Sequence, residues 1–279
     1  MNPSITSINI KKFEASCFID SEDTLAIEEP LEIKLVSGPI TNRQITDVSI
    51  TMRTPGNDLD LAIGFLFTEG IITSQTQIDF LFTTTHQPES NRINIYCKEE
   101  VSIDMRLLQR NFYTTSACGV CGKASMDAVW AVIRNPIQTD VMVSKEVILN
   151  LPEQLIRHQH TFRQTGGLHA AALFDKEGAL IQTREDVGRH NALDKLIGSF
   201  LQSSQESNFI PEASILLLSG RASFELLQKA AMAGIGMVCA VGAPSSLAVA
   251  TAEKFGITLI GFLKNNRFNI YANAHRVLP

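Results

Sequence analysis

The first third of the chain alternates between short runs of apolar and polar residues. Residues 31–35 alternate one by one, which is typical of a half-buried strand, and residues 45–52 follow a Gly-Pro turn as the expected hairpin partner. Two further strands are predicted at residues 80–84 and 92–98, joined by a polar turn. Residues 1–25 are polar and predict a loosely held, irregular arm.

A helix is predicted between these two pairs of strands. Asn57 or Asp58 is its expected N-terminal cap, and Gly70 is expected to end it. Together with the strands, this helix predicts a small α+β domain that covers residues 1–135 and ends in a cysteine loop with its own helix.

The second part of the chain changes to a pattern in which buried strands alternate with helices. Strands are predicted at residues 168–174, 179–183, 215–218, 237–241, 257–263 and 268–271. Helices are predicted to begin at Asn150 and to cover residues 190–201, 222–233 and 245–255. This alternation indicates a three-layer α/β domain over residues 136–279, with helices on a central sheet.

Composition and charge are those of a folded chain without a large basic surface. With 279 residues, of which 44% are hydrophobic and 19% charged, the chain is long enough for one large or two ordinary domains. Its formal charge of -5 and its lack of basic runs argue against nucleic acid or an anionic membrane as the main partner. The sequence contains no signal-peptide or membrane-spanning run, and its five cysteines suggest no disulfide framework, so we expect a reducing cytoplasm.

Soft nucleophiles cluster at one place in the sequence, a pair of cysteines flanked by glycines. Cys118 and Cys121 are each followed by a glycine, and Lys123 precedes a predicted helix at residues 124–133. The glycines indicate a mobile loop. A thiol beside a cation and just before a helix N-terminus is expected to have a lowered pKa, and therefore more of the reactive thiolate.

Four interpretations of this cysteine pair differ in what the thiols do. Inert core cysteines are disfavoured by the polar, glycine-rich surroundings, and a zinc site lacks the second cysteine pair that it usually has. A dithiol-disulfide oxidoreductase fits the spacing but lacks the strand and aromatic residue of a thioredoxin site. A sulfur carrier, which holds sulfane sulfur as a persulfide, fits as well, and the spacing does not separate the last two.

Polar side chains follow several strands of the second part and indicate a binding cleft. The candidate residues are His169, Asp186, Arg189, His190, Ser219, Gly220, Arg221, Phe262, Leu263, Lys264, Asn265, Asn266 and Arg267, together with two serines after Gly242. Loops that leave strands and enter helices are where α/β sheets bind ligands, and helix N-termini with guanidinium groups suit phosphate. We therefore predict a cleft for a large phosphorylated ligand, although a core histidine and a helix cap are alternatives for His169 and Asp186.

Several familiar catalytic patterns are missing from the sequence. There is no Gly-Lys-Ser/Thr phosphate loop, no dinucleotide fingerprint and no defensible Ser-His-Asp or paired-carboxylate arrangement. Cys97 and Cys239 lie in apolar strands and are expected to be packing residues.

Taken in order, these motifs resemble the formate dehydrogenase accessory sulfurtransferase family, FdhD, from about residue 25 to the end of the chain. The motifs are CGVCG at 118–122, GGLHAA at 166–171, EDVGRHNALDK at 185–195, SGR at 219–221 and the pair Gly261-Phe262. The resemblance implies a larger domain with a cytidine-deaminase-like fold and a homodimeric protein. Zinc deaminases need His-x-Glu and Pro-Cys-x-x-Cys, which this chain lacks, so we expect no bound zinc and no zinc hydrolysis.

The resemblance also implies a function and residue roles. It implies a carrier that takes sulfur from a cysteine desulfurase and passes it to the molybdenum (or tungsten) bis(molybdopterin guanine dinucleotide) cofactor of formate dehydrogenase. Cys118 matches the family's persulfide carrier, Cys121 is a candidate for releasing the sulfur, and residues 262–267 match the guanine dinucleotide segment. A general thiol-disulfide oxidoreductase and a non-catalytic cofactor chaperone remain the alternatives.

Overall fold

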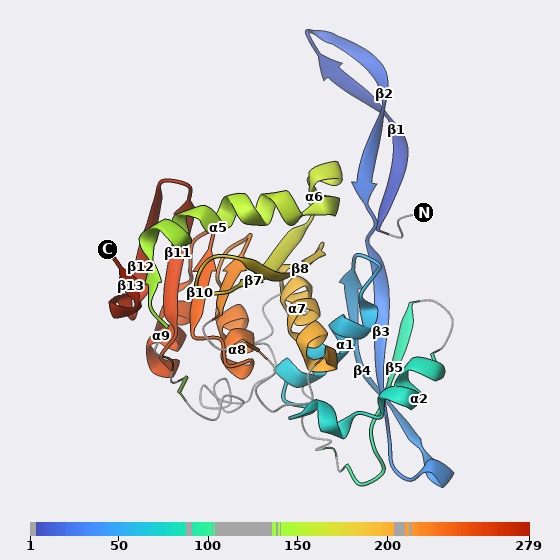
Figure 1. The fold of residues 1–279 in the computed structure, drawn as a ribbon. Coiled ribbons are helices and arrows are strands. Elements are labelled where there is room, and N and C mark those ends of the chain that lie inside the picture. The colour runs from blue at the N-terminus through green and yellow to red at the C-terminus, as the bar shows by residue number, and fades with distance from the viewer. Residues whose placement is uncertain are drawn as a thin grey trace.

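The computed structural model describes residues 4–87, 91–101, 103, 136–137, 139, 141–203, 210–211 and 214–279. Its first part is built on a three-stranded sheet of order β4-β3-β5 (Figure 1). Strand β3 (Glu29–Ser37) pairs antiparallel with β4 (Gln44–Arg53) and parallel with β5 (Arg92–Tyr96). The strands predicted at 31–35, 45–52 and 92–98 are therefore confirmed.

The second part is built on a six-stranded sheet of order β12-β11-β10-β9-β7-β8. Its strands are β7 (His169–Phe174), β8 (Leu180–Asp186), β9 (Ile215–Leu218), β10 (Met237–Ala240), β11 (Thr258–Lys264) and β12 (Arg267–Ala272). The helices that connect them are α7 (Arg189–Ser203), α8 (Phe224–Met232) and α9 (Ser246–Phe255). All six predicted strands and the three helices between them are present within a few residues of their predicted bounds.

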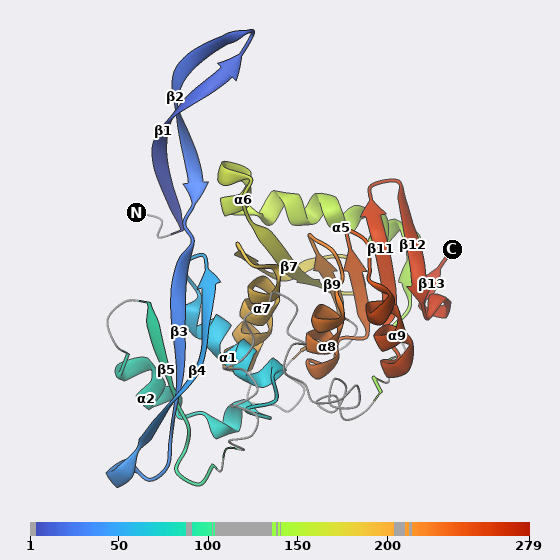
Figure 2. The same cartoon turned by 180° about the vertical axis from the view of Figure 1, so that it is seen from behind.

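Helices cover both faces of this sheet, which makes three layers (Figures 1 and 2). Along β7, Ala171 and Leu173 pack in one buried cluster with α7 and α8, whereas Ala172 and Phe174 pack in a second cluster with α5 (Lys145–His158). Because neighbouring residues of a strand point to opposite faces, β7 is buried on both sides, as are β9 and β10, and the sequences of these three strands are almost continuously apolar.

The two parts of the chain meet where helix α1 (Asp58–Thr68) crosses α7. Gly64 and Gly198 lie at the crossing, where a Cβ atom added to Gly64 would overlap the carbonyl of Asp194. The two helix backbones are therefore in direct contact. One cluster of buried apolar side chains continues from β3 through α1 and α7 to α8, so both sides of the predicted boundary at residues 135–136 share a core.

A buried ammonium group also joins the two parts. Lys229 on α8 donates to Thr68 (2.9 Å), Asp194 (3.0 Å) and Glu69 (3.2 Å), and both Lys229 and Asp194 are almost fully buried. Burial would lower the pKa of Lys229, but the Asp194 and Glu69 carboxylates raise it above its ordinary value. The charge is thus retained inside the core, where it ties α1 to α7 and α8.

Three sequence predictions about secondary structure were wrong. Residues 5–26 form an antiparallel hairpin of β1 (Ile5–Glu14) and β2 (Cys17–Ala26) instead of an irregular arm. Residues 80–85 form helix α2 (Phe80–Thr85), because Asp79 caps it by accepting a hydrogen bond from the N–H of Phe82. Helix α5 begins at Lys145 instead of Asn150, since Ser144 accepts from the N–H of Val147 and Pro152 is tolerated inside the helix.

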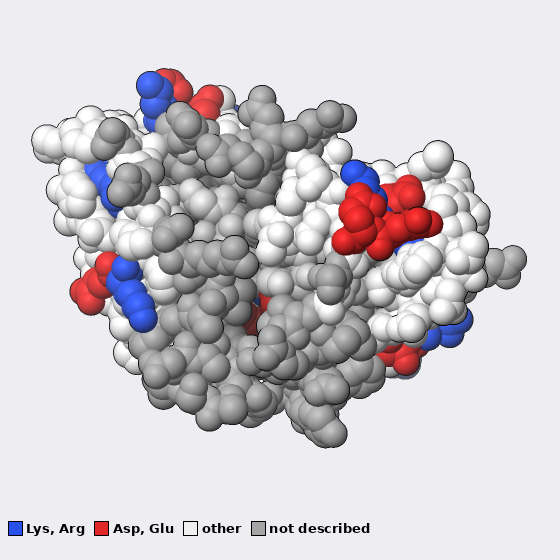
Figure 3. Space-filling model, turned by 90° about the horizontal axis from the view of Figure 1, so that it is seen from below, with Lys and Arg blue, Asp and Glu red and all other residues white. Residues whose placement is uncertain are grey.

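Short elements complete the fold. A small parallel sheet joins β6 (Val143–Ser144) to β13 (Val277–Leu278), and α6 (His160–Thr165) follows α5. Single turns of 3-10 helix lie at Ile40–Asn42, Gln75–Gln77 and Ala274–Arg276. Within the described ranges, no helix is long and apolar enough to cross a membrane. On the face shown in Figure 3, the described Lys and Arg side chains lie scattered and form no continuous basic patch.

Candidate functional site

The predicted polar loops come together at the end of the six-stranded sheet where β8, β9, β10 and β11 finish and β7 begins. We call this end of the sheet the edge. Because β7 runs antiparallel to both β8 and β9, its first residue, His169, lies beside Asp186 at the end of β8 and near the end of β9. The N–H of Gly242 donates to the carbonyl of Gly220 (2.9 Å), and the N–H of Phe262 donates to the carbonyl of Gly242 (3.0 Å). Five segments that are distant in sequence therefore form one continuous edge, as the strand pattern predicted.

Glycines allow the backbones at this edge to approach closely. A Cβ atom on Gly220 would lie 3.3 Å from Nδ1 of His169, and one on Gly242 would lie 3.0 Å from the backbone nitrogen of Arg221. A side chain at either position would push its neighbour away from the edge. The sequences SGR (219–221) and GAP (242–244) therefore hold the loops after β9 and β10 against each other and against His169.

Asp186 anchors the loop after β8 from beneath. Its carboxylate is fully buried and contacts Lys195 Nζ (2.7 Å), and it accepts hydrogen bonds from Gly188 N (2.8 Å), Asn191 Nδ2 (3.1 Å) and Thr54 N (3.2 Å). Lys195 also donates to the carbonyl of Thr54 (2.8 Å). We call the contacts among Asp186, Lys195 and Thr54 the clasp. Since protein groups occupy both carboxylate oxygens, we assign Asp186 to positioning the loop and not to contact with a ligand.

The two histidines at the edge are held as neutral imidazoles at neutral pH. Burial of the ring, helped by Lys229 and Arg189, lowers the pKa of His190 to about 3. Its Nε2 lies 3.3 Å from both Ser223 Oγ and Glu225 Oε2. Burial, followed by Arg189 and Arg221, also lowers the pKa of His169. These two rings can therefore bind a ligand through hydrogen bonds but contribute no positive charge.

Positive charge at the edge comes from arginine and lysine side chains. Arg221 is exposed, while Arg189 is partly buried and its Nε is buried without a hydrogen-bond partner in the part of the chain that the structure describes. Buried donors are normally paired, so this orphaned N–H is a place for an acceptor. Ser219 contributes structurally, because its hydroxyl accepts a 2.8 Å hydrogen bond from the N–H of Ala170.

The segment from Phe262 to Arg267 divides between core and surface. Phe262 has a left-handed backbone (φ 53°) and an exposed ring, whereas Leu263 is fully buried in the core beneath the sheet. Lys264, Asn265, Asn266 and Arg267 are exposed at the β11–β12 turn. Leu263 therefore anchors the segment, and the other five residues can meet a ligand.

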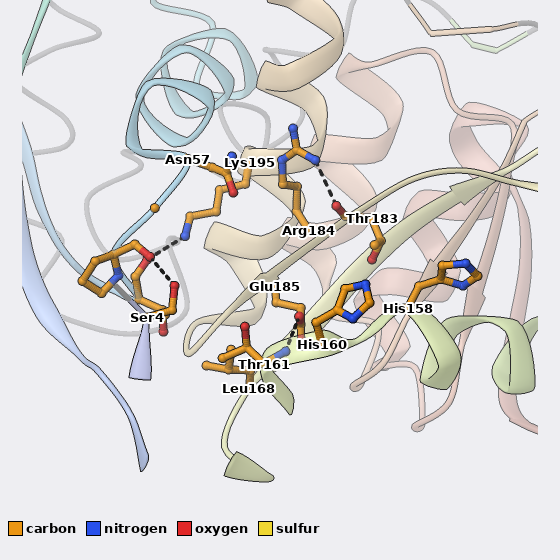
Figure 4. A pocket seen from close by; sticks show the side chains of 13 residues that line it. Ser4, Asn57, His158, His160, Thr161, Leu168, Thr183, Arg184, Glu185 and Lys195 are labelled. Atoms are coloured by element: carbon orange, nitrogen blue, oxygen red, sulfur yellow. Dashed lines mark hydrogen bonds between the residues drawn. The ribbon is translucent and has the colours of Figure 1, made fainter. Parts of the chain in front are cut away.

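Sequence reasoning missed a polar cavity of about 170 Å³ beside strand β8 (Figure 4). The turn after Thr54, residues 183–185 of β8, the start of α6 and Lys195 line it. Glu185 accepts hydrogen bonds from the N–H groups of Thr161 (3.0 Å) and Phe162 (2.8 Å). The signal in the sequence is the turn Pro55-Gly56-Asn57, of which only Asn57 enters the prediction, as an expected helix cap. Asn57 is indeed the residue before α1, but it is left-handed (φ 57°) and its side chain makes no capping hydrogen bond.

Comparison with known proteins identifies the family. The model of the FdhD/NarQ family matches residues 26–278, which is most of the chain and includes the whole of the edge described above. The chain belongs to the FdhD/NarQ family. The family resemblance seen in the sequence motifs is thereby confirmed.

Members of the FdhD/NarQ family from distant organisms match over nearly the full length. The sulfur carrier protein FdhD of Streptomyces coelicolor is 48% identical over 91% of this chain and 89% of its own length. The sulfur carrier protein FdhD of Mycobacterium tuberculosis is 44% identical over 96% of this chain and 96% of its own length. That of Saccharolobus solfataricus is 38% identical over 97% of this chain and 99% of its own length. A crystal structure of a proposed formate dehydrogenase accessory protein from Desulfotalea psychrophila shares the fold, with a TM-score of 0.72 at 22% identity over 99% and 100% of the two chains. The α/β fold predicted from the sequence is confirmed.

The cysteine pair of this FdhD/NarQ chain, Cys118 and Cys121, lies outside the described residues, as does Lys123. Among the described cysteines, burial raises the pKa of Cys97 to about 11 and that of Cys239 to about 12, so both are protonated and inert at neutral pH. The described part of the chain contains no group of three or more His, Cys, Asp or Glu residues placed to hold a metal ion.

Proposed function

We propose that this chain is a sulfurtransferase that carries sulfur on Cys118 from a cysteine desulfurase to the molybdenum bis(molybdopterin guanine dinucleotide) cofactor of formate dehydrogenase. The observation that carries the proposal is the full-length similarity to relatives named sulfur carrier protein FdhD. The glycine-flanked cysteine pair supplies the chemistry, and the polar edge of the sheet supplies a place for the cofactor, which is cargo and not a resident group.

The first chemical step is a sulfur exchange without net oxidation. The Cys118 thiolate attacks the terminal sulfur of the desulfurase persulfide, whose S–S bond breaks, and the desulfurase thiolate leaves. Cys118 then holds the terminal sulfur as its own persulfide. Lys123 and the helix predicted after it favour the attacking thiolate.

Release of the sulfur is the second step and uses Cys121. The Cys121 thiolate attacks the Cys118 sulfur, a Cys118–Cys121 disulfide forms, and hydrosulfide leaves toward the cargo. A dithiol reductant, itself oxidised to a disulfide, then returns the pair to two thiols. Both cysteines are thus needed for turnover, but Cys118 alone is enough for loading.

The sheet edge is the proposed binding site for the guanine dinucleotide part of the cargo. Arg189, Arg221, Lys264 and Arg267 supply the positive charge that pyrophosphate requires, and the orphaned Nε of Arg189 offers a donor. His169 and His190 contribute neutral hydrogen-bonding groups, and Phe262 an exposed aromatic face for a base. Gly220 admits close approach, while Asp186, Ser219 and Leu263 hold the edge in place.

The proposed partners follow from the same scheme. A cysteine desulfurase donates the sulfur, the catalytic subunit of formate dehydrogenase receives the finished cofactor, and the carrier works in the cytoplasm as a homodimer. The scheme requires no nucleic acid, membrane or bound zinc.

Sulfur loading is tested by intact-protein mass spectrometry after incubation with a cysteine desulfurase and cysteine. Wild type and Cys121→Ala are expected to gain the mass of sulfur, and Cys118→Ala is not. A gain that persists in Cys118→Ala would overturn the assignment of the carrier. Absence of a gain in all three proteins would favour the non-catalytic chaperone, and turnover of ordinary disulfides would favour the oxidoreductase.

A further inference from the structure

The β1–β2 hairpin, which we call the arm (residues 5–26), projects from the body of the molecule. Figures 1 and 2 show it leaving the body in the direction opposite to the β3–β4 sheet, and only its base approaches α6. Both of its edges lack a neighbouring strand among the described residues, since β1 and β2 form a sheet of their own. An isolated hairpin is marginally stable in water, and free edges and exposed apolar side chains invite a partner.

The two faces of the arm differ in character. Directly paired residues share a face, and the pairs Thr6–Leu25, Ile8–Asp23, Ile10–Ser21 and Lys12–Ile19 place four apolar side chains along one of them. Three of these, Ile8, Ile19 and Leu25, are exposed. The opposite face is polar between the Ile5–Ala26 pair at its base and the tip, where Phe13 and Phe18 are 64% and 72% exposed and their rings are 5.2 Å apart.

A second apolar surface lies on the three-stranded sheet. It consists of Ile45, Ile50 and Met52 of β4, which we call the sheet patch. Their partners on β3 are Val36, Glu32 and Pro30. These pairs lie on the side of the sheet away from the core residues Leu31 and Ile33. Ile45 and Ile50 are 62% and 71% exposed. More than half of the exposed large hydrophobic side chains in the described residues therefore fall within residues 8–52, on the arm, the sheet patch and the turn at Ile40.

Most charged side chains on the apolar face of the arm and beside the sheet patch form ion pairs within the same surface, and Asp23 adds one negative charge to the arm. Lys12 of the arm contacts Glu14 (2.8 Å), and Lys34 beside the sheet patch contacts Asp47 (2.7 Å) and Glu32 (3.2 Å). Neither surface therefore repels a copy of the same chain or attracts a strongly charged partner. The arm points away from the sheet patch of its own chain, so it cannot cover that patch itself (Figures 1 and 2).

We propose that the occupant of the sheet patch is the arm of a second copy of this chain, and that the exchange is reciprocal. A two-fold axis near the junction of β2 and β3 brings each arm alongside the sheet of the other copy. The same arm-to-sheet contact then forms twice, no apolar surface is left for a third copy, and the assembly is a closed dimer. This inference rests on the homodimer proposed above and names its interface. The pairing buries Ile8, Ile19 and Leu25 against Ile45, Ile50 and Met52.

The test introduces a charge on each surface and compares dimer dissociation constants by sedimentation. Ile8→Lys on the arm and Ile50→Lys on the sheet patch are each expected to weaken the dimer at least tenfold. Each lysine would face a carboxylate across its own strand pair, Asp23 or Glu32, so the folded arm and the folded sheet tolerate it. Ser7→Lys is the matched control, because it places the same charge on the same strand but on the polar face of the arm, and it leaves the dimer unchanged.

Three results would overturn the inference. They are a wild-type protein that stays monomeric, a dimer that tolerates both substitutions, and a dimer that is weakened by only one of them. Should a variant fail to fold, hydrogen exchange of the β4 amides is measured on the wild-type protein below and above the dimer dissociation constant. We expect these amides to exchange more slowly at the higher concentration. Equal exchange rates at the two concentrations would contradict the interface. Sulfur loading of Cys118, measured on the same variants, is independent of the dimer and keeps the two proposals separate.

Discussion

At the scale of single residues, the clasp is the contact on which the edge depends. Asp186 and Lys195 are both almost fully buried, and together they hold Thr54 of the first part against the loop that carries Arg189 and His190. The sequence placed Asp186 and Lys195 in one motif, but it could not show that Thr54, more than 130 residues earlier, completes their contacts. Long-range pairing of this kind leaves no periodic signal in the chain.

Removing one partner of the clasp leaves the other charge buried and unpaired. Lys195→Met is therefore expected to lower the free energy of unfolding by roughly 3–5 kcal/mol, measured by urea denaturation. Arg157→Met is the matched control, because its ion pair with Glu153 is exposed at the surface, and it is expected to change stability little. Equal effects of the two substitutions would contradict the role given to the clasp.

The buried ring of His190 predicts how stability depends on pH. Because the folded-state pKa is lowered from 6.5 to about 3, the unfolded chain binds a proton in this window that the folded chain does not. The contribution of His190 to stability is therefore present above pH 6.5 and is lost as pH falls toward 3. In His190→Gln, the free energy of unfolding should fall less steeply between pH 6 and about 4, while exposed His275→Gln should keep the wild-type slope. A slope unchanged in His190→Gln would show that the ring is not buried as described.

At the scale of elements, the central sheet could be predicted and the arm could not. The strands β9 and β10 are short and wholly apolar, because both of their faces are buried, and β11 is apolar from Leu259 to Leu263; such runs are easy to recognise. The arm is a strand pair with little buried surface, so its polar sequence resembles that of an irregular segment. Helix α2 was mistaken for a strand because its apolar run is short and only its cap at Asp79 distinguishes the two.

The crossing of α1 and α7 sets how closely the two parts of the chain approach each other. Gly64→Ala would raise intrinsic helix propensity, but its methyl group would overlap the Asp194 carbonyl and force the helices apart. We expect a net loss of about 1–3 kcal/mol, measured by thermal or urea unfolding. Gly167→Ala is the control, since its methyl group would meet no atom closer than 3.7 Å. Unchanged or increased stability of Gly64→Ala would contradict this close approach.

At the scale of the whole molecule, the candidate site is assembled from loops that only the sheet brings together. The order of strands, with β7 antiparallel between β8 and β9, places His169, Arg189 and Arg221 at one edge. The sequence predicted this gathering from the positions of polar residues after strands. It could not predict that Asp186 and Leu263 would point inward, because that depends on which neighbours fill the space beneath the edge.

Transfer of labelled sulfur to the cargo tests the account as a whole. Carrier loaded with radioactive sulfur by a desulfurase is separated from it, mixed with formate dehydrogenase that contains sulfur-free cofactor, and assayed for label on the cofactor and for formate oxidation. We predict that wild type transfers label and restores activity, that Cys118→Ala does neither, and that Arg221→Ala loads sulfur normally but transfers less. Equal transfer by wild type and Cys118→Ala would contradict the account.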